Sequence, residues 1–316
     1  METQPPTIPP QLATESTNPP NDSKPNLNKK TFTILGFEIL LVLIVGITAY
    51  LIYSAFEKHE RIQAQSLNTQ KTFEAYAFHI QDIEKRLEPT AASTVSLTDV
   101  TIAGLEESAK KMEASRSQSV RKSALLKRNI ENLKDPEVKD YKNSLSEYLT
   151  HSQELASYGY ESTNMFNRGI VPVIIELNAL NQKLQDPSLL ASADPVKIVS
   201  VFQEINGDLS DLESKLNSLP NVEDEYSNEI KDEASTMIKL QIQLIDAMNS
   251  AIQRNDVEAF YVTQQEVSAS QIESKKRFDA ALEKGLDKRE KLVTESRNYR
   301  KKVDSQYKIL KNKYDF

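Results

Sequence analysis

An uncharged apolar segment at residues 39–56 constrains the fold of this chain more than any other feature. Its 18 residues lie between Glu38 and Glu57, and the apolar character extends back toward residue 32. A helix needs roughly 20 predominantly apolar residues to cross a bilayer core of about 30 Å, and it satisfies its own backbone hydrogen bonds in lipid. The segment therefore predicts a single transmembrane helix at residues 31–56, surrounded by membrane lipid.

The sequence that flanks this segment predicts its orientation. The first 28 residues contain seven of the 13 prolines and few apolar side chains. A tail of that composition cannot bury a core, so we expect residues 1–30 to be disordered. Because Lys29 and Lys30 adjoin the segment on this side, the positive-inside rule favours a cytoplasmic N-terminus. We therefore expect a single-pass cell-membrane protein whose C-terminal domain is extracytoplasmic.

The composition after the anchor predicts helices and excludes several kinds of chemistry. The chain has seven glycines in 316 residues and no cysteine. Disulfides and thiolate chemistry are therefore excluded, and too few glycines remain for a phosphate-binding loop. Apolar residues recur at intervals of three and four, which is the helical period. We expect an all-α fold in which one N-terminal transmembrane helix precedes an elongated helical bundle or coiled-coil-like ectodomain.

Turn signals divide this ectodomain into two regions. Residues 57–186 are expected to form a helical hairpin region, made of a stalk helix and two long helices. Residues 187–316 form a second helical region with a heptad seam and a long basic C-terminal helix. The seam residues are spaced alternately four and three apart, as in coiled coils and bundles: Ile198, Phe202, Ile205, Leu209, Leu212, Leu216 and Leu219. Similar segments at 132–143 and 217–228 are consistent with either a duplication or chance.

We assign no catalytic, cofactor-binding or metal-binding residues. The three histidines are His59, His79 and His151, and the last two each precede an acidic residue, Asp82 or Glu154, by three positions. A metal site in a bundle needs several inward-facing carboxylates, whereas His79 lies beside the apolar stripe of its helix. No sequence motif places a serine against a base. We therefore expect surface histidines, no metal, no cofactor and no enzymatic activity.

The start of the apolar segment, residues 29–42, resembles the N-terminus of type IV pilins. A basic pair, a Phe-Thr dipeptide beginning at Phe32, and Glu38 follow one another in the order that this family shows. The resemblance implies that the glutamate pairs with the amino terminus of a neighbouring subunit in a fibre. The sequence departs from the family at Thr31, where the leader has glycine. It also places Glu38 seventh instead of fifth, and the helical remainder lacks the β-rich head.

Charge and architecture together lead to three functional hypotheses. Acidic residues outnumber basic ones by ten to two at 204–233, and basic residues outnumber acidic ones by eleven to five at 284–316. The first hypothesis is a membrane-anchored helical scaffold, spacer or cell-surface interaction protein. It would bind a protein partner or self-associate through the seam or the last helix, without binding nucleic acid. The alternatives are a pilin-like or secretion-system subunit anchored through Glu38, and a ligand- or metal-binding helical bundle. The basic C-terminal segment is a candidate for contact with anionic lipid.

Overall fold

The computed structural model describes residues 29–88, 101–184, 195–254 and 257–316 of the chain, with side chains from residue 42 onward except at 257 and 260. Within these residues all regular structure is helical and no strand occurs, which confirms the expected all-α class. The chain divides into two compact units, Met1–Lys58 and His59–Phe316. Residues 1–28, most of the expected disordered tail, lie outside the described residues, and Lys29 and Lys30 already belong to the first helix.

The first helix, α1 (Lys29–Leu87), passes through the boundary between the two units. In the first unit its apolar side chains from Val42 to Phe56 are exposed. A search of the described residues finds no helix that combines the length and the apolar character needed to cross a membrane. The side chains of residues 31–41 of the expected transmembrane helix lie outside the described ones.

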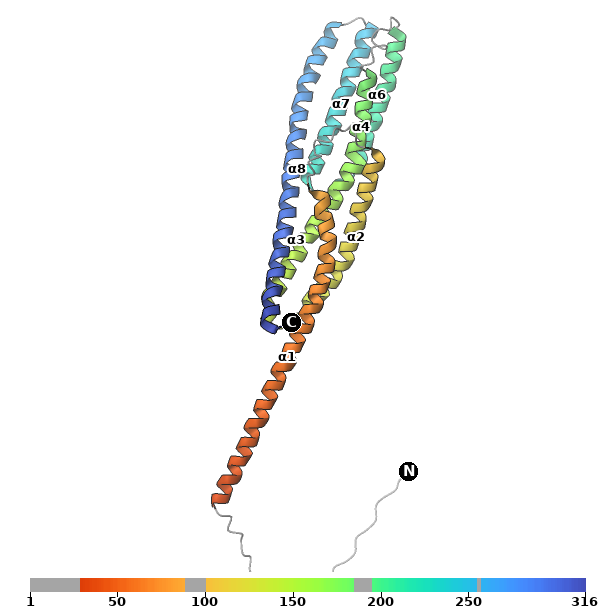
Figure 1. The fold of residues 1–316 in the computed structure, drawn as a ribbon. Coiled ribbons are helices and arrows are strands. Elements are labelled where there is room, and N and C mark those ends of the chain that lie inside the picture. The colour runs from red at the N-terminus through yellow and green to blue at the C-terminus, as the bar shows by residue number, and fades with distance from the viewer. Residues whose placement is uncertain (1–28, 89–100, 185–194, 255–256) are drawn as a thin grey trace, which may run out of the picture. The chain divides into compact units, whose positions relative to one another are not determined.

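The second unit contains two hydrophobic cores, which the long C-terminal helix α8 (Val257–Tyr314) connects (Figure 1). The first core is formed by the second half of α1, by α2 (Ile102–Asn132), by α3 (Lys139–Asn164) and by the C-terminal half of α8. Its centre is a cluster of aromatic rings, in which Phe73 and Tyr76 each meet Tyr148 edge to face at 5.2 and 5.9 Å. Such contacts stabilise a core beyond the area that they bury.

The second core is built around the predicted heptad seam. It combines α4 (Val171–Leu184), α6 (Pro195–Ser218) and α7 (Glu225–Arg254) with the N-terminal half of α8. The middle five seam residues, from Phe202 to Leu216, are fully buried in this core, while Ile198 and Leu219 pack at its edge. The seam therefore packs inside one chain.

The expected division of the ectodomain near residue 187 stays a prediction, because residues 185–194 lie outside the described part of the chain. The two similar segments do form corresponding helix corners. At the first, the Leu133 N–H donates to the Ile130 carbonyl, and at the second, the Leu219 N–H donates to the Leu216 carbonyl. In each corner a lysine, Lys142 or Lys231, donates to the carbonyl of that leucine.

Candidate functional site

The candidate site is a belt of polar interactions where the two cores meet, which we call the junction belt. It consists of three clusters, each built around one charged side chain: Arg168, Glu84 or Asp224. Five helices contribute to it, namely α1, α2, α3, α7 and α8, together with the short helix η4 (Met165–Ile170). No single sequence motif marks the belt, because its members are scattered over more than 200 residues of the chain.

A one-turn π-helix, η4, joins α3 to α4 at the belt. Pro172 lies just after it and lacks the N–H group that would bond to the Arg168 carbonyl in an α-helix. A π-turn is one of the ways in which a helix absorbs such an interruption. Gly169 in this turn faces Leu219, whose Cδ1 atom would lie 2.4 Å from an added Cβ. The helix continues through this π-turn into α4.

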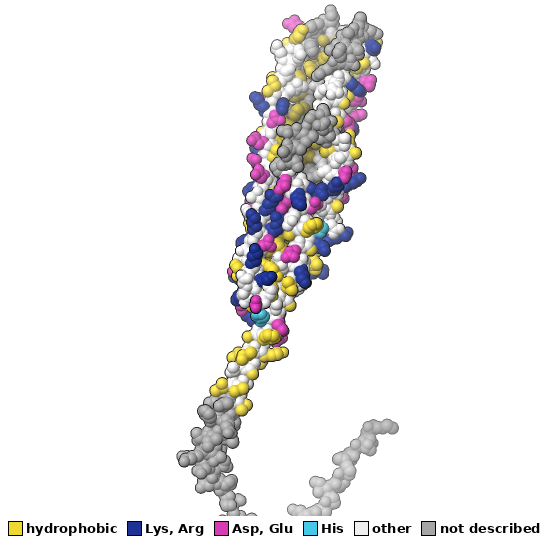
Figure 2. Space-filling model, viewed as in Figure 1, with side chains coloured by type: hydrophobic (Ala, Val, Ile, Leu, Met, Phe, Trp, Pro, Cys, Tyr) yellow, Lys and Arg dark blue, Asp and Glu magenta, His cyan; other side chains and the backbone are white. Residues whose placement is uncertain are grey.

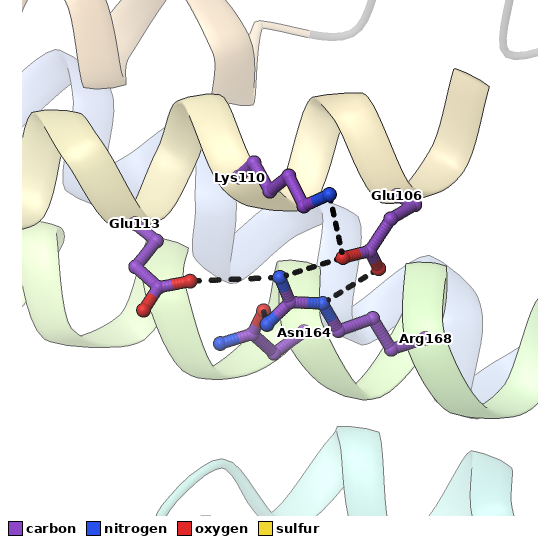
Figure 3. A network of polar contacts seen from close by, with 5 residues as sticks. All are labelled: Glu106, Lys110, Glu113, Asn164 and Arg168. Atoms are coloured by element: carbon purple, nitrogen blue, oxygen red, sulfur yellow. Dashed lines mark hydrogen bonds and ion pairs between the residues drawn. The ribbon is translucent and has the colours of Figure 1, made fainter. Parts of the chain in front are cut away.

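The first cluster fixes the start of α2 to this turn through Arg168 (Figure 3). The guanidinium donates to both carboxylate oxygens of Glu106, with Nε–Oε2 and Nη2–Oε1 distances of 2.9 and 3.1 Å. It also donates to Glu113 at 3.5 Å and to the side-chain carbonyl of Asn164 at 3.2 Å. Lys110 adds a second positive charge, 3.7 Å from Glu106. A bidentate arginine–carboxylate pair fixes orientation as well as distance.

The second cluster is buried between α1 and α8. The carboxylate of Glu84 is only 2% exposed and accepts a hydrogen bond from the Ser296 hydroxyl at 2.8 Å. Arg300 Nη1 lies 3.2 Å and Arg297 Nε 3.5 Å from Glu84 Oε2, and Arg297 also pairs with Glu88. Both oxygens of the buried carboxylate are thus occupied by groups of α8, as a buried charge requires.

The third cluster fixes the start of α7. Asp224 is the N-cap of this helix, and its Oδ2 atom accepts from the Ser227 N–H and hydroxyl at 3.0 and 2.6 Å. Lys288 of α8 donates to its other oxygen at 2.9 Å and lies 5.1 Å from the ring centre of Tyr158. Burial raises the pKa of Tyr158 to about 12, and its hydroxyl donates to the Gly285 carbonyl at 3.0 Å. Asp224 and Tyr158 are therefore both engaged in holding α8.

A small cavity of about 150 Å³ lies beside this third cluster. Four carboxylates line it, but Asp224 is occupied by Lys288 and Ser227, and Glu161 accepts from Ser157 and from the Glu223 N–H. The volume is below the range of about 300–1,000 Å³ that is usual for small-molecule sites. The belt is therefore suited to clamping helices and offers no unoccupied nucleophile–base pair.

The histidines lie apart from the junction belt clusters and from one another. His59 meets Tyr314 edge to face, His79 meets Phe78, and His151 stacks on Tyr299 at 4.2 Å. All three are half-buried. Within the described residues, no group of three or more histidine, aspartate or glutamate side chains is placed to hold a metal ion.

Glu38, on which the pilin-like alternative depends, has no described side chain, so that alternative remains a prediction. Glu84, Arg168 and Asp224 have no role in the predictions made from the sequence. For the second cluster, the sequence does contain one indication: Glu84 is a charged residue between Ile83 and Leu87 in an apolar stripe, and a charge in that position needs a buried partner.

Comparisons of the chain with protein-family models, with curated proteins and with solved structures return no match. The junction belt is therefore interpreted from its geometry alone. Its ion pairs and hydrogen bonds join neighbouring helices and hold them in position.

We expect Arg168→Met to remove a pH-dependent part of the stability. Hydrogen bonds from Arg168 hold the pKa of the Glu106 carboxyl below its ordinary value of 4.5, against a smaller opposing effect of desolvation. A carboxyl with a depressed folded-state pKa stabilises the fold above its unfolded-state pKa, and this contribution is lost as the pH falls through the folded-state pKa. The unfolding free energies of variant and wild type should therefore differ most above pH 4.5 and converge in stronger acid.

Urea titrations of the full chain at several pH values, followed by circular dichroism, measure this difference. Lys215→Met is the matched control, because it also removes one positive charge from an exposed interhelical pair, with Glu176 at 2.7 Å. A difference between Arg168→Met and wild type that stays constant from neutral to acid pH contradicts the assignment.

Proposed function

We propose that this protein is a membrane-anchored, non-enzymatic helical scaffold, whose second unit presents helical surfaces to a partner outside the cytoplasm. The observation that carries the proposal is the exposure of consecutive apolar side chains in the first unit. They are Val42, Leu43, Ile44, Val45, Ile47, Tyr50, Leu51, Ile52, Tyr53 and Phe56.

These side chains point in every direction around α1, because four consecutive residues already cover a full helical turn. A surface helix of a globular protein has one apolar face, whereas a helix that is apolar all round is buried in a large core or in a membrane. In the sequence the uncharged run starts at residue 39, so the whole segment has 18 residues. Its length is close to the roughly 20 residues that a bilayer core requires.

The scaffold part of the proposal is supported by the junction belt. Its charged groups are occupied by one another, and they hold α1, α2, α7 and α8 in fixed mutual positions. A bundle whose charged groups pair across helices in this way keeps its helices in place and presents their outer surfaces to a partner.

The expected result is that the full chain stays with the membrane fraction after an alkaline carbonate wash and floats with lipid in a density gradient. Topology can be measured in the same cells, because the chain has no cysteine of its own. With a membrane-impermeant maleimide, a cysteine at Gln118→Cys in α2 should react in intact cells, and one at Ser16→Cys should react only after lysis. Release by carbonate would contradict the anchor, and the reverse labelling pattern would contradict the orientation.

Intact mass separates this proposal from the pilin-like alternative. We expect the purified chain to retain residues 1–31. A mature chain that begins at Phe32 would indicate leader processing and would replace the scaffold proposal with a pilin-like subunit.

A further inference from the structure

The basic residues of α8 are only in part the free positive surface that the sequence suggested. Five of the eleven at 284–316 pair with carboxylates elsewhere in the second unit: Lys288 with Asp224, Arg297 and Arg300 with Glu84, Lys302 with Glu147, and Lys313 with Glu137. These five charges hold the bundle together, whereas Lys301 and Lys308 are exposed.

A second group of basic side chains, without an ion pair in the described part of the chain, lies on α1 and α2. Residues 116–128 of α2 contain five basic side chains and no acidic one. Of these, Arg116 lies over the ring of Tyr160 at 4.3 Å. The other four, like Lys71 of α1, make no ion pair within the described residues: Arg121, Lys122, Lys127 and Arg128. Lys127 is two positions from Leu125 in the helix, so it does not share a face with that residue. Figure 2 shows dark-blue, magenta and yellow side chains intermixed over the second unit.

Large apolar side chains are exposed on the same stretch of the two helices. Phe78 is 67% exposed, Leu125 is 47% and Leu67 is 40%. The Thr72 hydroxyl accepts from Asn129 at 2.8 Å, and the Ser115 hydroxyl donates to Asp82. These two contacts fix residues 72–82 of α1 antiparallel to residues 115–129 of α2. We call this surface, with its exposed Phe78 and Leu125 and the basic residues Lys71, Arg121, Lys122 and Arg128, the α1–α2 face.

The line where the two helices meet is hollowed at one end of this face. A cavity of about 250 Å³ is lined by side chains with uncharged hydrogen-bonding groups and one lysine: Gln65, Asn68, Thr69, Asn129, Asn132 and Lys134. Of the nearby carboxylates, Asp82 is paired with Arg86 and accepts from Ser115, whereas Glu74 accepts, within the described residues, only from the uncharged Gln70 and is outnumbered by the four basic residues of the face. The face is therefore positive, partly apolar and elongated.

We propose that the α1–α2 face binds an acidic amphipathic helix of a partner protein. Carboxylates on such a helix complement the unpaired Lys and Arg side chains, and its apolar residues cover Phe78 and Leu125, as in other helix-in-groove interfaces. A simple polyanion would leave the two apolar side chains in water, so their exposure among the basic residues favours the amphipathic protein helix. This inference deepens the proposed scaffold role by naming the chemistry of its partner.

The test uses the purified full chain in a mild non-ionic detergent, which keeps it in solution whether or not the segment 39–56 enters lipid, with detergent alone as the blank. The probe is a fluorescent synthetic helix with leucines along one face and glutamates beside them, and binding is followed by anisotropy. A scrambled peptide of the same composition and polyglutamate are the comparison ligands. We expect the amphipathic peptide to bind more tightly than either, and its affinity to fall between about 0.1 M and 1 M salt, where the screening length shrinks from about 10 Å to 3 Å.

Two double variants separate the apolar from the charged contribution. Phe78→Ala/Leu125→Ala and Arg121→Glu/Arg128→Glu should each weaken peptide binding by about tenfold or more, since central contacts dominate such interfaces. The matched control is Lys301→Glu/Lys308→Glu, which reverses two exposed charges at the same seven-residue spacing on α8 and should leave binding unchanged.

Three outcomes would overturn the proposal. One is equal binding of polyglutamate and the amphipathic peptide, with no effect of Phe78→Ala/Leu125→Ala, which would indicate a polyanion site. A second is peptide binding no tighter than that of the scrambled sequence. The third is that both double variants weaken binding to anionic lipid vesicles but leave peptide binding unchanged, which would indicate a membrane-binding surface. None of these depends on the carbonate and flotation results, so the anchor and the partner surface are tested separately.

Discussion

The double variant Arg297→Met/Arg300→Met should lose about 3 to 5 kcal/mol of unfolding free energy. Both guanidiniums contact the carboxylate of Glu84, which is buried between α1 and α8 and keeps only the Ser296 hydroxyl once they are removed. A buried carboxylate that loses its counter-charges retains its full desolvation cost, and this cost, not the strength of the pair itself, sets the size of the effect.

A third substitution tests this explanation. Adding Glu84→Met to the double variant removes the stranded charge and should recover most of the lost stability, because an apolar replacement of a whole buried cluster is often neutral or better. Urea titration of the full chain, monitored by circular dichroism, gives all three free energies. The matched control, Lys302→Met, removes an exposed pair with Glu147 on the same helix and should change stability little.

If the triple variant is no more stable than the double variant, the loss comes from packing of the arginine side chains and not from the stranded carboxylate. If the double variant is as stable as Lys302→Met, the second cluster does not hold α8 to α1. Either result would remove Glu84 from the junction belt.

The general architecture was predictable because it depends on periodic spacing. Apolar residues at intervals of three and four predicted the all-α class, and the seam from Ile198 to Leu219 is packed where a heptad repeat places it, on one face of α6. What spacing could not decide is whether such a face meets its own chain or another one, since both use the same residues. The structure places the seam in the second core.

The middle of α2 shows a limit of reading packing from residue polarity. Its stretch from 115 to 123 is rich in serine and largely polar on all sides, yet Ser115, Ser119 and Ser123 are buried. The hydroxyls of Ser119 and Ser123 donate to the carbonyls of residues three positions earlier, at 2.8 Å in each case. A serine whose hydroxyl bonds to a carbonyl of its own helix needs no other partner, so its small side chain can be buried. Polarity scales alone do not predict this burial.

The junction belt could not be predicted from one sequence for a different reason. Arg168 and Glu106 are 62 positions apart, and Glu84 and Ser296 are 212 apart. Local patterns identify a charged residue and its helical face, but the partner depends on which helices become neighbours. The same limit explains why the basic C-terminal segment suggested a free surface, whereas five of its eleven basic residues pair with carboxylates elsewhere in the second unit.

The second large effect concerns the proposed anchor. Ile47→Arg/Leu51→Arg places two charges near the centre of the segment 39–56, on one side of α1. Each arginine at the centre of a membrane helix costs about 2.5–3.5 kcal/mol of insertion free energy, so the pair should cost roughly 5–7 kcal/mol. We expect this variant to be released by the carbonate wash and to lose flotation with lipid, while wild type does neither.

The matched control places the same charges at equally exposed apolar positions outside the segment. Ile47, Leu51, Ile272 and Ile309 are all between 55% and 61% exposed. Ile272→Arg/Ile309→Arg on α8 should therefore retain membrane attachment if the segment 39–56 is the anchor. Exposure of an apolar side chain has a different meaning in the two units. On α8 it is an isolated side chain at a solvated surface, which is common in soluble domains, and on α1 it belongs to a run that covers every face. Equal release of both variants, or of neither, would contradict that distinction and the anchor with it.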